Sequence, residues 1–203
     1  MIALLFLAAA AAGPSFEPLN PKQIWLDQND YPVSEANAGR GGVADVKLTV
    51  APSGQPEQCL IVASSGNAVV NATICRLSMK RLRFKPPLSA DGAAIYAIWA
   101  RHTQMLPMGT SNRYTPANTP FTLEVVDTSG QLTKSTAVQV VVEVDSTGAL
   151  KQCGPRDPAD AATMIDRACS EVKTAWIAAP ETNAAGATIA YVRWAAVRFD
   201  PVR

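Results

Sequence analysis

The sequence predicts an α+β protein of two tandem small ββαβ domains, each an antiparallel sheet packed on one helix with an internal disulfide. The first observation is an internal repeat, because Cys59 and Cys153 are offset by 94 residues, as are Cys75 and Cys169. Self-similarity at a fixed offset indicates duplicated structural units. The same ungapped offset pairs further residues: Val46 with Val140, Val50 with Val144, Gly54 with Gly148, Gln58 with Gln152, Ala68 with Ala162, Pro86 with Pro180, Gly92 with Gly186 and Ile95 with Ile189.

The second observation is the order of hydrophobic patterns in the first copy. Residues 43–50 alternate between apolar and polar side chains, which is typical of a half-buried strand. A turn ending at Gly54 leads to a second strand over residues 58–63, so the two strands form a hairpin. A helix follows, and Pro86 stops it before an apolar strand at residues 93–100. The apolar stripe expected on this helix consists of Ala68, Ala72, Cys75, Met79 and Leu82.

The second copy has the same order of patterns. Residues 137–144 are the expected first strand, Gly148 belongs to the turn, and a further strand ends near Cys153. The Asp-Pro pair at residues 157–158 predicts a helix start, with Asp as N-cap and Pro at the first helical position. The last strand is expected over residues 187–199. The apolar stripe expected on this second helix consists of Ala162, Ile165, Cys169, Val172 and Trp176.

The predicted domains cover residues 25–106 and 121–203, separated by a Pro- and Gly-containing linker at residues 107–120. Residues 121–126 alternate well enough to form an extra strand, which belongs either to the first sheet or to the second. The two sheets either remain separate or join edge to edge, and the second arrangement would hide their last strands.

The N-terminus predicts export from the cytoplasm. Eleven apolar residues follow Met1, too few to span a bilayer but suited to the hydrophobic core of a signal peptide. Ala10 and Ala12 provide small residues for cleavage before Gly13, so residues 1–12 are the expected signal peptide. No Lys or Arg precedes the apolar run, and the alternative is a buried N-terminal helix. An even number of cysteines agrees with the oxidising periplasm.

The repeat selects the disulfides Cys59–Cys75 and Cys153–Cys169, because each copy then closes its own core. A zinc site is the alternative, but zinc ligands usually come in pairs two to four residues apart, and His102 is the one histidine. No metal or cofactor is therefore expected. The net charge of +1 gives no reason to expect a nucleic-acid partner. A local basic run is read as a solvated helix face or as a phosphate-binding patch: Arg76, Lys80, Arg81, Arg83 and Lys85.

Several turn and strand-end motifs of the first copy follow one another in a recognisable order. They are Tyr31-Pro32, Ser34 to Ala38, Gly41-Gly42-Val43, Pro52-Ser53-Gly54, Ser64-Ser65-Gly66, Arg83-Phe84-Lys85-Pro86 and Gly92. With them, residues 31–104 resemble the TonB C-terminal domain. The second copy resembles it more weakly: it has Gly148, Trp176, Pro180 and Gly186, but it lacks the Tyr-Pro and Ser-Ser-Gly motifs.

The resemblance implies a periplasmic module that pairs, by strand addition in transmembrane transport, with an extended segment of an outer-membrane transporter. An exposed sheet edge offers unpaired N–H and C=O groups to such a strand. The alternative for the last strands is ordinary packing within the sheet. The candidate partner-binding edge residues are Ile95, Ala97, Ile98, Trp99, Ile189, Tyr191, Val192 and Trp194.

The chain differs from a full energy transducer of that family, which has a spanning helix and a long Pro-rich linker. Neither pattern occurs here, so we predict a binding relative unless an upstream start adds an anchor. No catalytic residues and no small-molecule substrate are expected. Two alternatives remain: a structural or adaptor envelope protein with no role in energy transduction, and a hydrolase that uses Ser64 or Ser65. A nucleophile elbow needs Gly-x-Ser-x-Gly, and neither serine has that context.

Overall fold

The computed structural model of the chain describes residues 13–20, 25–106, 122–128 and 132–202. The predicted signal peptide and linker lie outside these described residues. Within them, no helix has the length and apolar character needed to cross a membrane. The elements, in order, are a 3₁₀ helix η1 (Gln28–Asp30), α1 (Val33–Asn37), β1 (Gly42–Val50), β2 (Pro56–Ala63), α2 (Ala68–Arg81), β3 (Tyr96–Met105), β4 (Thr122–Asp127), β5 (Thr136–Val144), β6 (Leu150–Pro155), α3 (Ala162–Ala175), β7 (Glu181–Thr182), β8 (Thr188–Ile189) and β9 (Tyr191–Pro201).

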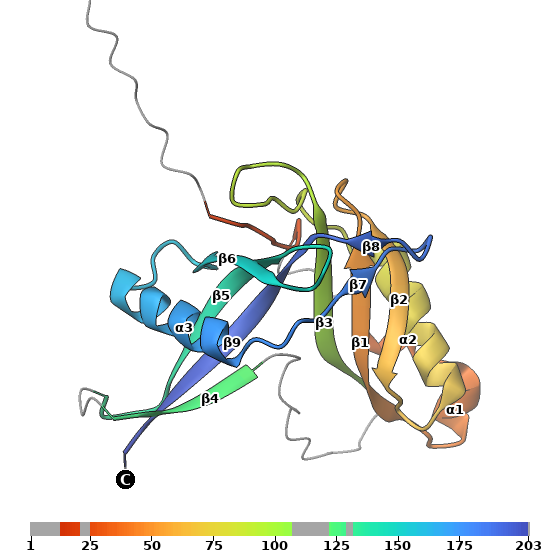
Figure 1. Cartoon of the computed structure of the whole chain (residues 1–203). Helices are drawn as coiled ribbons and strands as arrows, with labels where there is room; N and C mark the ends of the chain where they lie inside the picture. The colour runs from red at the N-terminus through yellow and green to blue at the C-terminus, as the bar shows by residue number, and fades with distance from the viewer. Residues whose placement is uncertain (1–12, 21–24, 107–121, 129–131, 203) are drawn as a thin grey trace, which may run out of the picture.

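One mixed sheet runs through the molecule (Figure 1). Its strand order is β2-β1-β3-β9-β5-β6, and β4 pairs with β9 as well. Most neighbours are antiparallel, whereas the pairs β3–β9 and β4–β9 are parallel. The α+β class is confirmed. The two antiparallel sheets are not separate, however, because β3 and β9 join them edge to edge.

Both hairpins turn at a glycine that no other residue replaces easily. Gly54 has a φ of 82°, and a Cβ added there would lie 2.1 Å from the Phe84 carbonyl oxygen. Gly148 has a φ of 86°, and a Cβ there would lie 2.4 Å from the Pro180 nitrogen. Glycine tolerates positive φ and lets two backbones approach closely. Each hairpin turn is thus pressed against the segment that follows the helix of the same half.

The two helices pack on opposite faces of the sheet. Ala97 and Trp99 of β3 belong to the core that includes residues of α2, whereas Ile98 belongs to the core that includes residues of α3. Because successive strand residues point to opposite faces, the two cores lie on different sides of β3. Rotating one half by 180° about an axis parallel to the strands keeps the direction of its strands and exchanges the two faces of its sheet. Two similar halves that are joined by the parallel β3–β9 pair therefore have their helices on opposite faces.

Two sequence expectations about the helices differ from the structure. The buried face of α2 is formed by Val70, Thr73, Ile74, Leu77 and Ser78, so the stripe through Ala68 and Ala72 is rotated from the true one. Helix α3 begins at Ala162 rather than at Pro158, because Asp157 closes a separate turn by accepting from the Ala159 N–H at 2.9 Å. The stripe predicted for α3 places Ile165 and Val172 correctly, since both are buried.

Each half contains one disulfide between its second strand and its helix. Cys59 is joined to Cys75 and Cys153 to Cys169, with a Cα–Cα distance of 5.7 Å in both cases. These are the predicted pairings. Each bond closes a loop with a sequence separation of 16 residues and holds the helix on the sheet.

Removing the first disulfide should destabilise the protein. In the double variant Cys59→Ser, Cys75→Ser, we expect the free energy of unfolding to fall by about 3 kcal/mol, because the unfolded chain regains the entropy of a loop of this size. Urea unfolding under non-reducing conditions measures the change. The matched variant Cys153→Ser, Cys169→Ser should lose a similar amount. Unchanged urea midpoints in both variants would show that the bonds contribute nothing to stability.

Candidate functional site

The predicted edge residues are distributed over three strands and a loop. Ile95 precedes β3, and Ile189 lies in the short strand β8 rather than in the last strand. Strand β3 contains Ala97, Ile98 and Trp99, and strand β9 contains Tyr191, Val192 and Trp194.

These residues of β3 and β9 lie in the middle of the sheet. Strand β3 pairs with β1 from Ala97 to Met105, and its first three residues pair with residues 191–193 of β9 on the other side. Strand β9 is also paired with β5. Ala97, Tyr191 and Val192 are fully buried. The expectation of a free edge at these positions is therefore wrong, because the junction of the two halves covers it.

The later part of β3 has a different environment. After Ile98 the strand leaves β9, which pairs instead with β4 from Ala196 onward. The two strands start side by side and then diverge (Figure 1). Along residues 99–105, β1 is the only strand of the described chain that pairs with β3. This segment is therefore an edge of the described sheet, and Trp99 is the one predicted edge residue that lies in it.

The side chains along this edge differ in exposure. Arg101 and Gln104 are exposed, while Thr103 and Met105 are buried. His102 lies opposite Asp45 of β1, and its Nδ1 is 2.5 Å from Asp45 Oδ1. The imidazole is thus held against a carboxylate on the neighbouring strand.

A small hollow of about 170 Å³ lies at the end of this edge. Tyr31 forms part of its wall and donates a hydrogen bond from its hydroxyl to the Arg40 carbonyl oxygen. Burial raises the pKa of Tyr31, and the nearby Glu35 carboxylate raises it further. The residues that line the hollow are Leu26, Asp27, Gln28, Tyr31, Gln104, Met105 and Leu106.

The wall of the hollow is fixed to the C-terminal end of α2 by an ion pair. The Arg81 guanidinium binds both Asp30 oxygens, at 2.5 and 2.7 Å, and donates to the Trp25 carbonyl oxygen at 3.1 Å. Its hydrogen bond to Asp30 lowers the pKa of that carboxyl group. Arg81 belongs to the basic run noted in the sequence, and here it serves to hold η1 on the helix.

Glu35 joins α1 to the start of α2. Although it is a carboxylate, only 3% of its surface is exposed. It accepts hydrogen bonds from Arg40 Nε at 2.9 Å and from Asn67 Nδ2 at 2.6 Å. Asn67 in turn caps α2 by accepting from the N–H groups of Val69 and Val70. The Arg40 and Asn67 hydrogen bonds lower the pKa of Glu35 to about 2.

The hydroxyl groups proposed for a hydrolase take part in this helix start. Ser64 Oγ accepts from Gly66 N at 3.0 Å and from Asn71 Nδ2 at 2.8 Å. Ser65 Oγ donates to Asn71 Oδ1 at 2.7 Å. The one histidine of the chain contacts Asp45 instead of either serine. Both serines therefore serve as turn and capping residues.

In the described part of the chain, no three His, Cys, Asp or Glu side chains gather where they could hold a metal ion.

Comparison with known proteins gives one match. Residues 27–100 match the family model described as Gram-negative bacterial TonB protein C-terminal. The matched region contains η1, α1, β1, β2, α2 and the first residues of β3, so it includes Tyr31 and the Glu35 cluster. Residues 101–203 lie outside the match. No curated protein and no solved structure matches the chain significantly.

The first half of the molecule should lose stability in acid through Glu35. Its carboxyl pKa falls on folding from an ordinary value of 4.5 to about 2, so its contribution is fully present above pH 4.5 and disappears as the pH approaches 2. Glu35→Gln should therefore be less stable than the parent protein at pH 7, and this difference should shrink between pH 5 and pH 2. Urea midpoints over this range measure it.

The control is Glu124→Gln, which changes an exposed glutamate of β4. We expect its urea midpoint at pH 7 to equal that of the parent protein, because its side chain is exposed. A difference between Glu35→Gln and the parent protein that stays constant with pH would contradict the assignment.

Proposed function

We propose that this protein is a periplasmic protein-binding module, related to the TonB C-terminal domain, that engages an outer-membrane transporter or another envelope protein in transmembrane transport. The family match over residues 27–100 is the observation that carries the proposal. The resemblance implies that the module binds an extended segment through backbone pairing at a sheet edge. In this proposal residues 1–12 are a signal peptide, and the two disulfides form in the oxidising periplasm.

The proposed strand-addition site is the edge of β3 at residues 99–105. Two features support it: no described strand covers this edge, and the hollow at Tyr31 lies at its end. An incoming strand satisfies its own backbone groups and those of β3, while one of its side chains enters the hollow. The proposed site therefore begins at Trp99, which is the last of the edge residues predicted for the first half.

We further propose that residues 25–106 and 121–203 are tandem copies of one ββαβ unit. The support comes from the equal cysteine offsets, the two disulfides with the same Cα–Cα distance and the paired turn glycines Gly54 and Gly148. The last strand of the second copy is covered by β3, β4 and β5. The second copy therefore acts as a structural companion of the first.

Site-specific crosslinking in living cells tests the binding site. A photoreactive residue at Arg101 or Gln104 should crosslink to outer-membrane transporter proteins, because both side chains are exposed on the proposed edge. The matched control is Lys173, an exposed residue of α3 on the other half of the molecule. Equal crosslinking from Lys173 and from Arg101, or none from either edge position, would overturn the proposed site.

A structural or adaptor role without energy transduction is the second candidate. The observation that favours it is the β3–β9 junction, which uses part of the edge that the family resemblance assigns to a partner. This role predicts that envelope extracts contain no saturable partner for the protein. Quantitative pull-down at increasing extract concentration separates the two candidates.

A further inference from the structure

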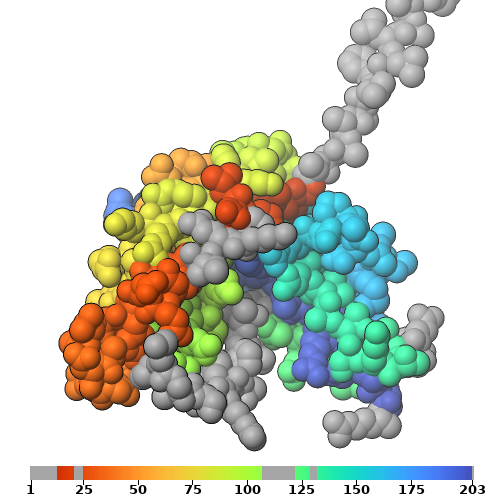
Figure 2. Space-filling model, turned by 180° about the vertical axis from the view of Figure 1, so that it is seen from behind, coloured from red at the N-terminus to blue at the C-terminus, as the bar shows by residue number. Residues whose placement is uncertain are grey.

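An extended segment at residues 13–19 lies across both halves of the molecule (Figure 2). It contains no helix or regular strand, and its recorded side-chain and backbone bonds go to residues far along the chain. It pairs with the segment after α2 as an added strand would, through isolated bridges at Ser15–Leu88 and Pro18–Phe84. The backbone bonds are Ser15 N to Leu88 O at 2.9 Å, Leu88 N to Ser15 O at 2.9 Å, Lys85 N to Glu17 O at 3.0 Å and Leu19 N to Arg83 O at 2.9 Å.

Phe16 anchors the segment between the two halves. It is only 2% exposed, and its ring centroid lies 5.1 Å from that of Phe84 and 5.4 Å from that of Trp194. Trp194 Nε1 also donates to the Phe16 carbonyl oxygen at 2.7 Å. A buried aromatic anchor in a pocket is typical of the residues that dominate peptide recognition.

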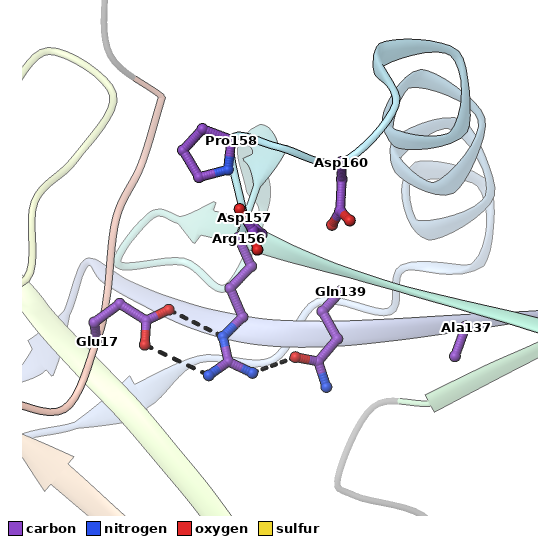
Figure 3. Close-up of a pocket in the computed structure, with 7 residues that line it drawn as sticks. All are labelled: Glu17, Ala137, Gln139, Arg156, Asp157, Pro158 and Asp160. Carbon is purple, nitrogen blue, oxygen red and sulfur yellow. Dashed lines mark hydrogen bonds and ion pairs between the residues drawn. The ribbon is translucent and has the colours of Figure 1, made fainter. Parts of the chain in front are cut away.

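Arg156 of the second half binds the Glu17 carboxylate (Figure 3). Arg156 Nε donates to Glu17 Oε1 at 3.0 Å, and its guanidinium lies 3.7 Å from the centre of the Trp194 ring. Gln139 accepts a further hydrogen bond from Arg156. The guanidinium is therefore held in place by stacking and by hydrogen bonding, which suits it to recognise a carboxylate.

We propose that the surface formed by residues 83–88, Arg156 and Trp194 is a peptide-binding groove, and that residues 13–19 are its resident occupant. Its ligand class is an extended peptide with an aromatic residue followed by an acidic residue and proline, as in Phe16, Glu17 and Pro18. Backbone pairing, an aromatic pocket and a carboxylate receptor are supplied by residues 83–88 and by the second half. A partner segment with the same chemistry can make the same contacts.

Because residues 13–19 are covalently connected to the rest of the chain, they compete strongly with a free peptide for the groove. A tethered ligand acts at an effective concentration on the order of millimolar. A free peptide therefore binds poorly while the tethered segment is in place, and access to the groove depends on its release. This groove is separate from the β3 edge, so either site can fail experimentally without the other.

The test uses the complete, disulfide-bonded chain with a protease recognition sequence inserted between Asn20 and Trp25. After cleavage of the folded protein, a fluorescent synthetic peptide of residues 13–20 is titrated and its anisotropy is measured. We expect saturable binding to the cut protein and little binding to the uncut protein. Circular dichroism before and after release of the segment reports whether the remaining chain stays folded.

Peptide and protein variants identify the contacts. Phe16→Ala in the peptide should weaken binding by about a hundredfold or more, because it empties an aromatic pocket. Glu17→Lys in the peptide and Arg156→Ala in the protein should each weaken binding by roughly tenfold, with less salt dependence than the parent pair. The matched control is Arg198→Ala, since Arg198 is on β9 and pairs with Asp200 instead. This variant should bind as the parent does.

Three results would overturn the proposal. They are a cut protein that binds no peptide, a scrambled peptide of the same composition that binds equally well, and a chain that unfolds when the segment leaves. In each case residues 13–19 are simply part of the folded core.

Discussion

The structure depends on the parallel pairing of β3 with β9. Only three residue pairs form it, from Tyr96–Tyr191 to Ile98–Arg193, yet it makes the two halves into one sheet. Parallel pairing places the two helices on opposite faces, so each face of the junction is covered by one half. Val192 of the second half therefore lies in the core under α2, while Ile98 of the first half lies in the core under α3. Neither half buries its last strand alone.

The sequence predicted those structural features whose physical cause is local or is repeated in both halves. Equal cysteine offsets predicted both disulfides, and alternation at residues 43–50 predicted β1, because a strand with one buried face has a period of two. The buried faces of the helices were predicted less accurately. In α2 the buried face also includes Thr73 and Ser78, whose polarity hides the true stripe from a pattern of apolar residues.

The binding surface was harder to predict, because it depends on contacts between distant parts of the chain. A strand at a sheet edge and a strand in its centre have similar apolar sequences when both faces are buried. Residues 95–99 therefore gave no indication that β9 would cover their first part. The segment around Phe16 was missed for the same reason, since one aromatic residue among prolines and polar residues has no periodicity. The one feature of the sequence that could have indicated this segment is Phe-Glu-Pro at residues 16–18, shortly after the predicted cleavage site.

The central position of the C-terminal strand has a consequence for biosynthesis. Strand β9 follows every other described strand in the sequence, and it supplies buried residues to both cores. During translation, these residues emerge after those of every other described strand. Neither core can be completed before then, so the earlier strands stay incompletely packed until β9 has emerged.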